Sequence, residues 1–484
     1  MRVCFVTSEC VPFVKTGGLA DVSGALPKAL ARLGCEVKVF LPLYSSINTT
    51  DHGLAFAHDL YGIHTSIGNK IVHFHVWYKK DDGSGVEYYF IENLTYYHRS
   101  QVYTSDPDED ERFILLQNAV LQILQRYNWT PDILHCNDWQ TALLPVYLKE
   151  KFSWDSLFAK TASVLSIHNL GYQGRFGSSS IFKAGLMYNK YYPGGTYEFH
   201  NSFSFLKAGI VYADLITTVS ETYAREIQTP EFGASMDGVL STRRDSLFGI
   251  LNGIDTEHWS PRVDKFIAHH YDVEDLAPKL KNKQALLAQM QLPFDENIPT
   301  IGMISRLTPQ KGFELLPPVF HEIMKFPLQL VVLGSGEQKY EDFFRWAVYE
   351  YPDKVSAYFG FNNHLAHLIT AGCDMFLMPS RYEPCGLNQM YSLNYGTVPI
   401  ARRTGGLADT VHDYYEFNGD GNGFSFYDFT PYALWTSVGR ALDLFHQKNI
   451  WREIIQRGMG ADFSWETSAK KYLEVYKRAK MRRA

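Results

Sequence analysis

The first residues of the chain decide its fold class, because they pass from an apolar strand through a glycine turn into a helix. Residues 2–34 read RVCFVTSECVPFVKTGGLADVSGALPKALARLG. The apolar run at 2–8 is typical of a buried strand, and apolar residues from Val22 to Leu33 then recur at helical spacing until Gly34 ends the helix. A strand, a glycine loop and a helix in this order predict a parallel sheet covered by helices.

The same order returns along the whole chain. Further strands are predicted at 36–42, 131–138, 162–169 and 213–220, and again at 298–306, 328–336, 373–381 and 397–406. Residues 71–78 and 86–93 flank KKDDGSG and predict a hairpin, and a helix is predicted over roughly 110–127. The predicted fold class is therefore α/β, with two Rossmann-like doubly wound domains.

The predicted domain boundary lies near GILNGIDTEHWSP (249–261), where Asn252-Gly253 and Pro261 interrupt the pattern. This divides the chain into an N-terminal domain at 1–250 and a C-terminal domain at 251–460. The remaining segment, 461–484, contains the cationic amphipathic stretch SWETSAKKYLEVYKRAK. Such a stretch either packs as a terminal helix, which is the commoner case, or lies on a membrane.

The composition limits the classes of function. The 484 residues are 45% hydrophobic and 20% charged, which is typical of a folded protein with a large core. A net charge of −6 and the lack of a long apolar run predict no nucleic-acid partner and no membrane span. The six cysteines form no Cys-x-x-Cys pair, so we expect buried, reduced thiols in a reducing compartment. Aromatic residues, at 15%, serve either packing or a sugar-binding surface.

Polar residues follow many of the predicted strands at the point where each strand ends. Because ligands of open parallel sheets bind at the carboxyl ends of the strands, these residues predict a ligand site. They occur in both halves of the chain, so we expect the site in a cleft between the two domains. In chain order they are Lys15, Gly17, Gly18, Asp21, Asp138, His168, Asn169, Arg306, Lys311, Arg381, Glu383, Cys385 and Arg403.

The hexapeptide TGGLAD occurs twice, at 16–21 behind Lys15 and at 404–409 behind Arg403. Glycine permits a tight turn and a close approach of backbone N–H groups to a ligand, and the following helix directs its N-terminal dipole there. Each copy predicts a site for an anion such as a diphosphate, with an ordinary loop-to-helix turn as the alternative. The copies occupy different places in the two halves, which argues against duplication; we expect them to face each other across the cleft.

Neither copy matches the dinucleotide fingerprint or the phosphate loop, which argues against a dehydrogenase and an NTPase. Arg306 and Lys311 in SRLTPQKG can clamp a diphosphate and offset its charge as it leaves, although ordinary surface charges are the alternative. Glu383 can accept hydrogen bonds from sugar hydroxyls, and His168 can donate to a sugar or a carbonyl. The acidic run DPDEDER (106–112) is interpreted as a solvated loop that caps the next helix rather than as a metal site.

Segments in both halves resemble the bacterial glycogen synthase and plant starch synthase family, the ADP-glucose-type retaining glucosyltransferases. They follow the family's order over nearly the whole chain. The similar segments are VKTGGLADVSGALPKAL (14–30), HCNDWQTALLP (135–145), IHNLGYQG (167–174), LITTVSETYAREI (215–227), GILNGIDTEHWSP (249–261), ISRLTPQKG (304–312), PSRYEPCGLNQMYSLNYGT (379–397) and RTGGLADTV (403–411).

The resemblance implies a fold of the GT-B type, with two Rossmann-like domains facing across a deep cleft and the last helix crossing back to the first domain. It implies transfer of glucose from ADP-glucose to the 4-hydroxyl at the non-reducing end of an α-1,4-glucan, with retention of configuration. The acceptor would be glycogen, starch or a maltooligosaccharide. No cofactor and no metal are expected, because protein cations hold the diphosphate. The implied location is the bacterial cytoplasm, or the plastid stroma if a transit peptide was removed.

The family's motifs also imply residue roles. Catalytic roles carry over to Glu383, Arg306, Lys311, His168 and Asp138. Substrate-binding roles carry over to Lys15, Gly18, Asp21, Tyr97 (with Tyr96 as the alternative), Asn252, Phe361 (expected to stack on adenine), Cys385, Gly386, Leu387, Thr404, Gly405 and Gly406.

One departure bears on classification. Many related transferases carry Glu-x7-Glu where this chain has Glu383 and Tyr391, and the tyrosine is consistent with the ADP-glucose branch. Two alternatives stay open at this point. One is an α-glucan phosphorylase, which requires pyridoxal phosphate, and the other is a glucan-binding scaffold without activity.

Overall fold

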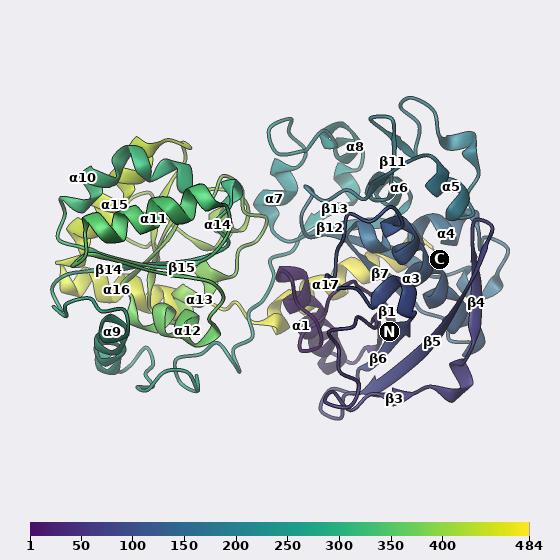
Figure 1. Cartoon of the computed structure of the whole chain (residues 1–484), viewed down its shortest axis with the longest axis horizontal. Helices are drawn as coiled ribbons and strands as arrows, with labels where there is room; N and C mark the ends of the chain where they lie inside the picture. Colours follow the sequence, from purple (N-terminus) through teal and green to yellow (C-terminus); the bar gives the residue numbers. More distant parts are fainter. Residues whose placement is uncertain (484) are drawn as a thin grey trace. The chain divides into compact units, whose positions relative to one another are not determined.

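The computed structural model describes residues 1–483, which form two compact units (Figure 1). The first unit contains Met1–Val219, Ala224–Gly253 and the C-terminal segment from Trp465 onward. The second unit contains the short stretch Ser220–Tyr223 together with Ile254–Ser464. Each unit is built around its own sheet.

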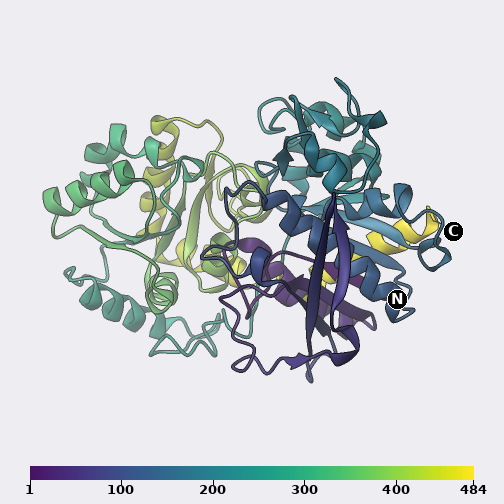
Figure 2. The ribbon, with the colours of Figure 1, turned by 45° about the vertical axis from the view of Figure 1, so that its right-hand side comes forward.

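The sheet of the first unit has ten strands in the order β13-β12-β8-β7-β1-β2-β6-β5-β3, with β4 paired to β5. Neighbouring strands are parallel from β13 to β6, which confirms the predicted alternation of strands and helices. The central strand β1 is buried from Val3 to Val6, as expected for a strand covered on both faces. The long strand β5 pairs antiparallel with β6, which confirms the predicted hairpin (Figure 2, dark blue arrows).

The strands of the first unit are β1 Arg2–Val6, β2 Glu36–Pro42, β3 Ala55–Phe56, β4 Ile63–Ile67, β5 Lys70–Lys80, β6 Glu87–Glu92, β7 Ile133–Asn137, β8 Ala162–Ile167, β9 Arg175–Phe176, β10 Glu198–Phe199, β11 Ser202–Ser204, β12 Leu215–Thr218 and β13 Leu247–Gly249. Its helices are α1 Gly18–Arg32, α2 Leu94–Tyr97, α3 Glu109–Arg126, α4 Leu144–Glu150, α5 Ser179–Lys183, α6 Phe205–Tyr212, α8 Asp237–Ser241 and α17 Trp465–Met481, and α7 Glu221–Glu226 begins in the second unit's short stretch.

The sheet of the second unit has six parallel strands in the order β16-β15-β14-β17-β18-β19. Alternate residues of β15 enter different cores. Leu330 and Val332 pack with residues of α11, whereas Val331 and Leu333 pack with residues of α9 and α12. Figure 1 shows α10 and α11 on one side of this sheet and α9, α12 and α13 on the other. The unit is therefore doubly wound, as predicted.

The strands of the second unit are β14 Thr300–Ile304, β15 Gln329–Gly334, β16 Val355–Phe359, β17 Met375–Met378, β18 Val398–Arg402 and β19 Phe424–Phe426. Its helices are α9 Ala277–Gln289, α10 Phe320–Met324, α11 Gln338–Glu350, α12 Asn363–Gly372, α13 Asn388–Asn394, α14 Gly405–Thr410, α15 Pro431–Phe445 and α16 Lys448–Met459.

The acidic run before α3 differs in part from its predicted form. Asp106 is exposed ahead of the helix, as expected, but the interpretation as a solvated loop is wrong from Glu109 onward. Glu109, Asp110 and Glu111 form the first turn of α3 and are buried. Burial is tolerated because each carboxylate has a cation beside it: Glu109 pairs with Arg112, and Lys183 contacts both Asp110 and Glu111. The run therefore anchors this part of the first unit from the inside.

The C-terminal helix α17 is a packed helix of the first unit. The Tyr476 hydroxyl hydrogen-bonds His135 Nδ1 in the core at 2.5 Å, and Ser468 Oγ donates to the Leu251 carbonyl at 2.7 Å. All six cysteines are buried, and none forms a disulfide within residues 1–483, in line with the expected reduced thiols. Among residues 1–483, no helix has the length and apolar character needed to cross a membrane.

Candidate functional site

The predicted residues of the first unit lie at the carboxyl ends of its parallel strands, where the chain leaves β1, β7 and β8. Lys15 and the glycine pair Gly17-Gly18 follow β1 and open helix α1. The Lys15 ammonium forms an ion pair with Asp21 at 2.7 Å, and the lysine side chain is half exposed. A Cβ added to Gly17 or to Gly18 would meet no atom within 4 Å. The structure thus brings Lys15, Gly18 and Asp21 together around an open turn.

The turn is hydrogen-bonded to the carboxylate of Glu9, a residue that was not among the predicted site residues. Glu9 is almost fully buried and accepts hydrogen bonds from the backbone N–H groups of Thr16 and Gly17 and from the Thr16 hydroxyl. The Tyr103 hydroxyl donates to the same carboxylate at 2.6 Å. Glu9 lies three residues beyond the end of β1. It could have been found from the sequence, because polar residues that follow the strands of a parallel sheet are candidates for a ligand site.

Asp138, directly after β7, has an unusual backbone. Its φ of 55° and ψ of −170° lie in a region that residues other than glycine rarely adopt, at a cost of roughly 1–3 kcal/mol. Neighbouring strands hold it there, since its N–H donates to the Ser166 carbonyl and its carboxylate accepts from the His168 N–H at 2.7 Å. Burial, with a smaller contribution from the nearby charge of Glu9, raises the pKa of Asp138 to about 7.

His168, at the end of β8, is also buried, and burial lowers its pKa to about 3. The imidazole is therefore neutral at physiological pH. Its Nε2 lies 2.9 Å from Asn137 Oδ1, and the Asn137 amide nitrogen donates to the Val6 carbonyl. The amide oxygen must then be the acceptor, so Nε2 carries the proton and donates to Asn137. The sequence predicted that this side chain donates to a sugar or a carbonyl. In the structure its Nε2–H donates to Asn137 within the first unit.

Tyr97 lies in the interior of the first unit. Its side chain is fully buried, and its hydroxyl donates to the Arg112 carbonyl at 2.7 Å. The alternative residue, Tyr96, is also buried, and its hydroxyl donates to Glu111 at 2.5 Å. Asn252 is buried as well, and its side-chain oxygen has no hydrogen-bond partner in the described part of the chain. An unpartnered buried oxygen of this kind is available to a water or a ligand.

In the second unit, the predicted clamp residues follow β14 and β17. Lys311 Nζ lies 2.6 Å from Glu383 Oε2, and Ser380 Oγ donates to the same oxygen at 3.0 Å. Glu383 is 6% exposed, so this carboxylate is held in place with little access to water. Arg306 is exposed and forms no ion pair within residues 1–483. The structure thus joins Lys311 to Glu383 and leaves the charge of Arg306 facing solvent.

The turn around Cys385 and the second TGGLAD copy pack directly on each other. Gly406 N donates to the carbonyls of Glu383 and Pro384. Gly405 has a φ of 46°, and a Cβ there would lie 1.9 Å from the Glu383 oxygen; at Gly406 it would lie 2.0 Å from the Cys385 oxygen. Predicted residues of this region that come together are Glu383, Cys385, Gly386, Leu387, Thr404, Gly405 and Gly406, at the ends of β17 and β18.

Phe361 and Tyr391 also lie in the second unit. Phe361 follows β16 and is 91% exposed, so its ring is open to stacking. Tyr391, at the second position of Glu-x7-Glu, is buried and stacks on Trp259 with ring centroids 4.1 Å apart. The His367 ring also stacks on Trp259, with ring centroids 3.6 Å apart. This stack could not be predicted from the sequence, because Trp259 and Tyr391 are far apart in the chain.

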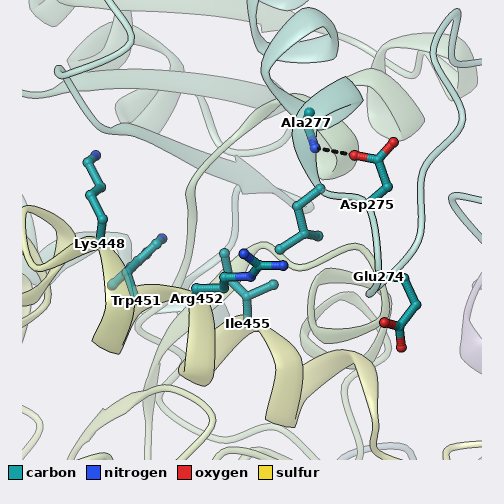
Figure 3. A pocket seen from close by; sticks show the side chains of 8 residues that line it. Glu274, Asp275, Ala277, Lys448, Trp451, Arg452 and Ile455 are labelled. Carbon is teal, nitrogen blue, oxygen red and sulfur yellow. Dashed lines mark hydrogen bonds between the residues drawn. The ribbon is translucent and has the colours of Figure 1, made fainter.

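A cavity of about 310 Å³ lies elsewhere in the second unit, beside α16 and the segment before α9 (Figure 3). Figure 3 shows Lys448, Trp451 and Arg452 projecting from α16 and an Asp275–Ala277 hydrogen bond opposite them. None of the predicted site residues lines this cavity. In the part of the chain that the structure describes, no group of three or more His, Cys, Asp or Glu side chains is placed to hold a metal ion.

Comparison with known proteins defines the class. The family model described as the starch synthase catalytic domain matches residues 2–242, and the model described as glycosyl transferases group 1 matches residues 288–453. The chain resembles the catalytic domain of Starch Synthase IV from Arabidopsis thaliana bound to ADP and acarbose, with a TM-score of 0.91 and 31% identity over 99% of both chains. Sucrose-phosphate synthase from Thermosynechococcus elongatus shares the fold, with a TM-score of 0.59 at 18% identity. The protein is a glycosyltransferase of the GT-B fold, as the sequence predicted.

Curated relatives narrow the class to one family. The chain is 44% identical to a glycogen synthase of Clostridium novyi over 98% of both sequences. It is 43% identical to a glycogen synthase of Bacillus cereus over 99% of both, and 44% identical to one of Desulforudis audaxviator over 99% of this chain and 96% of the relative. The chain belongs to the glycogen synthase family, which confirms the predicted resemblance and the glycogen or starch synthase function.

Proposed function

We propose that this chain transfers glucose from ADP-glucose to the 4-hydroxyl at the non-reducing end of an α-1,4-glucan, with retention of configuration, in the cytoplasm. The relatives named glycogen synthase support a glucan product, and the starch synthase bound to ADP and acarbose supports an adenine nucleotide and a glucan-like acceptor. The single observation that carries the proposal is the cation and carboxylate set at the ends of β14 and β17.

This set suits the departure of a diphosphate. Arg306 and Lys311 supply two positive charges in the loop after β14, and Lys311 forms an ion pair with the buried Glu383 carboxylate. In the proposed step, the bond from the glucose anomeric carbon to the diphosphate oxygen breaks, and a bond to the acceptor oxygen forms on the same face. The acceptor proton passes to the departing phosphate oxygen. The two cations stabilise the negative charge that develops on ADP, and Glu383 favours the positive charge on the sugar.

The other predicted residues take binding roles in this proposal. Lys15, Gly18 and Asp21 contact the donor from the open turn after β1, and Asn252 offers its unpartnered oxygen to a ligand. His168 is neutral and its side-chain proton is used by Asn137, so its backbone carbonyl is the group proposed to bind glucose. Phe361 is proposed to stack on adenine, because its ring is almost fully exposed.

The decisive experiment measures release of ADP and of UDP from the two nucleotide glucoses in the presence of glycogen primer. We expect transfer from ADP-glucose, and a loss of kcat on the order of 10²–10³ in Lys311→Ala and in Arg306→Ala, because each removes a charge aimed at the leaving group. Lys325→Ala is the matched control, since the one ion pair of Lys325 within residues 1–483 is an exposed pair with Glu322. Turnover near wild type in both variants would contradict the proposed clamp, and no ADP release at all would contradict the function.

A further inference from the structure

Glu9 is a buried carboxylate, and three of its four side-chain hydrogen bonds come from the turn that follows Lys15. One of its oxygens accepts from the N–H groups of Thr16 and Gly17, and the other accepts from the Thr16 hydroxyl at 2.7 Å and from the Tyr103 hydroxyl at 2.6 Å. The Glu9 side chain has no cationic partner within hydrogen-bonding distance in residues 1–483. Its negative charge is balanced by these donors alone, which is a demanding arrangement for a buried group.

The arrangement decides which backbone groups of the turn face a ligand. A glycine turn ahead of a helix normally offers its N–H groups to an anion. Here the N–H groups of Thr16 and Gly17 already serve an internal anion, Glu9, so the turn is fixed from the protein side. The open space lies over Gly17 and Gly18, where an added Cβ would meet nothing within 4 Å. The turn at Thr16–Gly18 is thus hydrogen-bonded to Glu9 on one side and borders open space on the other.

Tyr103 connects this carboxylate to the rest of the first unit. Its hydroxyl also hydrogen-bonds Ser8 Oγ at 2.8 Å, and the next residue, Thr104, donates through its hydroxyl to Glu109 at 2.6 Å. Burial and the neighbouring charge of Glu9 raise the pKa of Tyr103 well above its ordinary value, so the hydroxyl stays protonated and remains a donor. Glu9 is therefore anchored at the start of α3, through Tyr103 and Thr104.

We propose that Glu9 is a positioning residue for the donor substrate, with Tyr103 as its support. The carboxylate holds Thr16 and Gly17 in one conformation, so that Lys15 and Gly18 are presented to the nucleotide sugar without a cost of ordering on binding. The inference rests on the proposed function, since it assigns to Glu9 the orientation of a residue proposed to bind ADP-glucose. Glu9 does not touch the substrate in this proposal; it acts through the turn.

The test compares Glu9→Gln with wild type. The amide keeps the size of the side chain but places an N–H₂ group against donors, so the turn loses part of its support. We expect the KM for ADP-glucose to rise about tenfold or more, with the KM for glycogen unchanged, because the loss of one preorganised contact falls on donor binding. Tyr103→Phe, which removes one of the donors to Glu9 and leaves the carboxylate, is expected to show the same change at a smaller size.

Two further variants separate positioning from simple stability. In Lys15→Ala, the added Glu9→Gln change is expected to have little further effect on the donor KM, because the two residues act as one unit. Asp214→Asn is the matched control: Asp214 is also a buried carboxylate of the first unit, and it accepts from the N–H and hydroxyl of Ser163. It is expected to lower the melting temperature without changing the donor KM.

The outcomes distinguish this inference from the function on which it rests. If wild type releases ADP but Glu9→Gln and Tyr103→Phe keep the wild-type donor KM, the positioning role is overturned and the function stands. The positioning role is also overturned if Glu9→Gln raises the KM for ADP-glucose as much in Lys15→Ala as in wild type. It is overturned as well if Asp214→Asn raises this KM as much as Glu9→Gln does. If Glu9→Gln does not fold, Tyr103→Phe and its combination with Lys15→Ala decide the matter. A wild type that transfers nothing from ADP-glucose removes both proposals.

Discussion

The two TGGLAD copies have identical residues and opposite surroundings. In the first copy, in the first unit, Gly17 and Gly18 border open space, and their turn is bonded underneath to Glu9. In the second copy, in the second unit, Gly405 and Gly406 are pressed against the carbonyls of Glu383 and Cys385. The first pair of glycines borders space that no other part of the described chain fills. The second pair is needed because the backbone of the Glu383–Cys385 turn lies where a side chain would be.

The acids that end the two copies differ in the same way. Asp21 pairs with the half-exposed Lys15. Asp409 instead accepts hydrogen bonds from the backbone N–H and the hydroxyl of Thr222, in the first turn of α7. A sequence motif thus fixes a local conformation, a turn leading into a helix, while its role depends on the segments packed around it. The first copy borders open space, as its proposed role in donor binding requires, and the second copy packs against the turn that carries Glu383.

The strongest test of this comparison is Gly405→Ala. The residue has a φ of 46°, and its new Cβ would lie 1.9 Å from a backbone oxygen that cannot move away alone. We expect a loss of roughly 3 kcal/mol or more in the free energy of unfolding, from the strained conformation and the overlap together. Thermal and urea unfolding of the variant measure it, and activity is expected to fall with the displacement of Glu383.

Gly18→Ala is the matched variant in the first copy. Its Cβ would enter open space, and its φ is not left-handed, so we expect the stability to stay within about 0.5 kcal/mol of wild type. A rise in the KM for ADP-glucose without a loss of stability would sharpen the comparison, because it would show that the open space is used by a ligand. Equal destabilisation by the two alanine variants would show instead that the two copies do the same structural work.

The second prediction concerns pH, because the first copy lies near a titrating carboxyl. Asp138 has a pKa of about 7 in the folded protein, raised from an ordinary value of 3.8. Since the folded state binds this proton more tightly than the unfolded state, Asp138 supports folding at low pH, and this support is lost as the pH rises through about 7. The loss between pH 5 and pH 8 is expected to reach up to about 2.6 kcal/mol.

Asp138→Asn checks this prediction. The amide does not ionise, so the difference in unfolding free energy between pH 5 and pH 8 is expected to shrink in the variant relative to wild type. Urea unfolding at both pH values measures the difference. Glu9→Gln tests whether Asp138 is coupled to the first copy. Removing the negative charge of Glu9 is expected to lower the pKa of Asp138, so the loss of stability is expected at lower pH. An identical pH dependence in wild type and Asp138→Asn would contradict the assignment.

Much of the fold could be predicted from the sequence, because it depends on local patterns. Strands such as β14 and β17 are short, mainly apolar runs. The polar residues that follow β7, β14 and β17 place Asp138, Lys311 and Glu383 at the carboxyl ends of the strands in their sheets. The strands that were missed include β9, β10 and β11, each only two or three residues long. Strands this short contain no periodicity to detect.

The site was less predictable, because its details depend on long-range packing. The burial of Glu111 depends on Lys70 and Lys183, which come from β5 and α5. These partners cannot be predicted from the acidic run itself. Tyr97 was predicted to face the sugar and lies inside, because α3 covers it. The role of Glu9 requires a turn that brings Thr16 back to the end of β1. In each case, the residue type is visible in the sequence but its partner is not.

The smallest effect we predict separates the two aspartates. Asp409→Ala removes both acceptors from the first turn of α7 and is expected to cost about 1 kcal/mol of unfolding free energy, the usual cost of losing a helix N-terminal cap. Asp21→Ala breaks a partly exposed ion pair with Lys15, and we expect its effect on stability to stay below about 0.5 kcal/mol. Urea unfolding of both variants measures the two effects. A larger cost at Asp21 than at Asp409 would reverse the assignment of the open copy to substrate and the packed copy to structure.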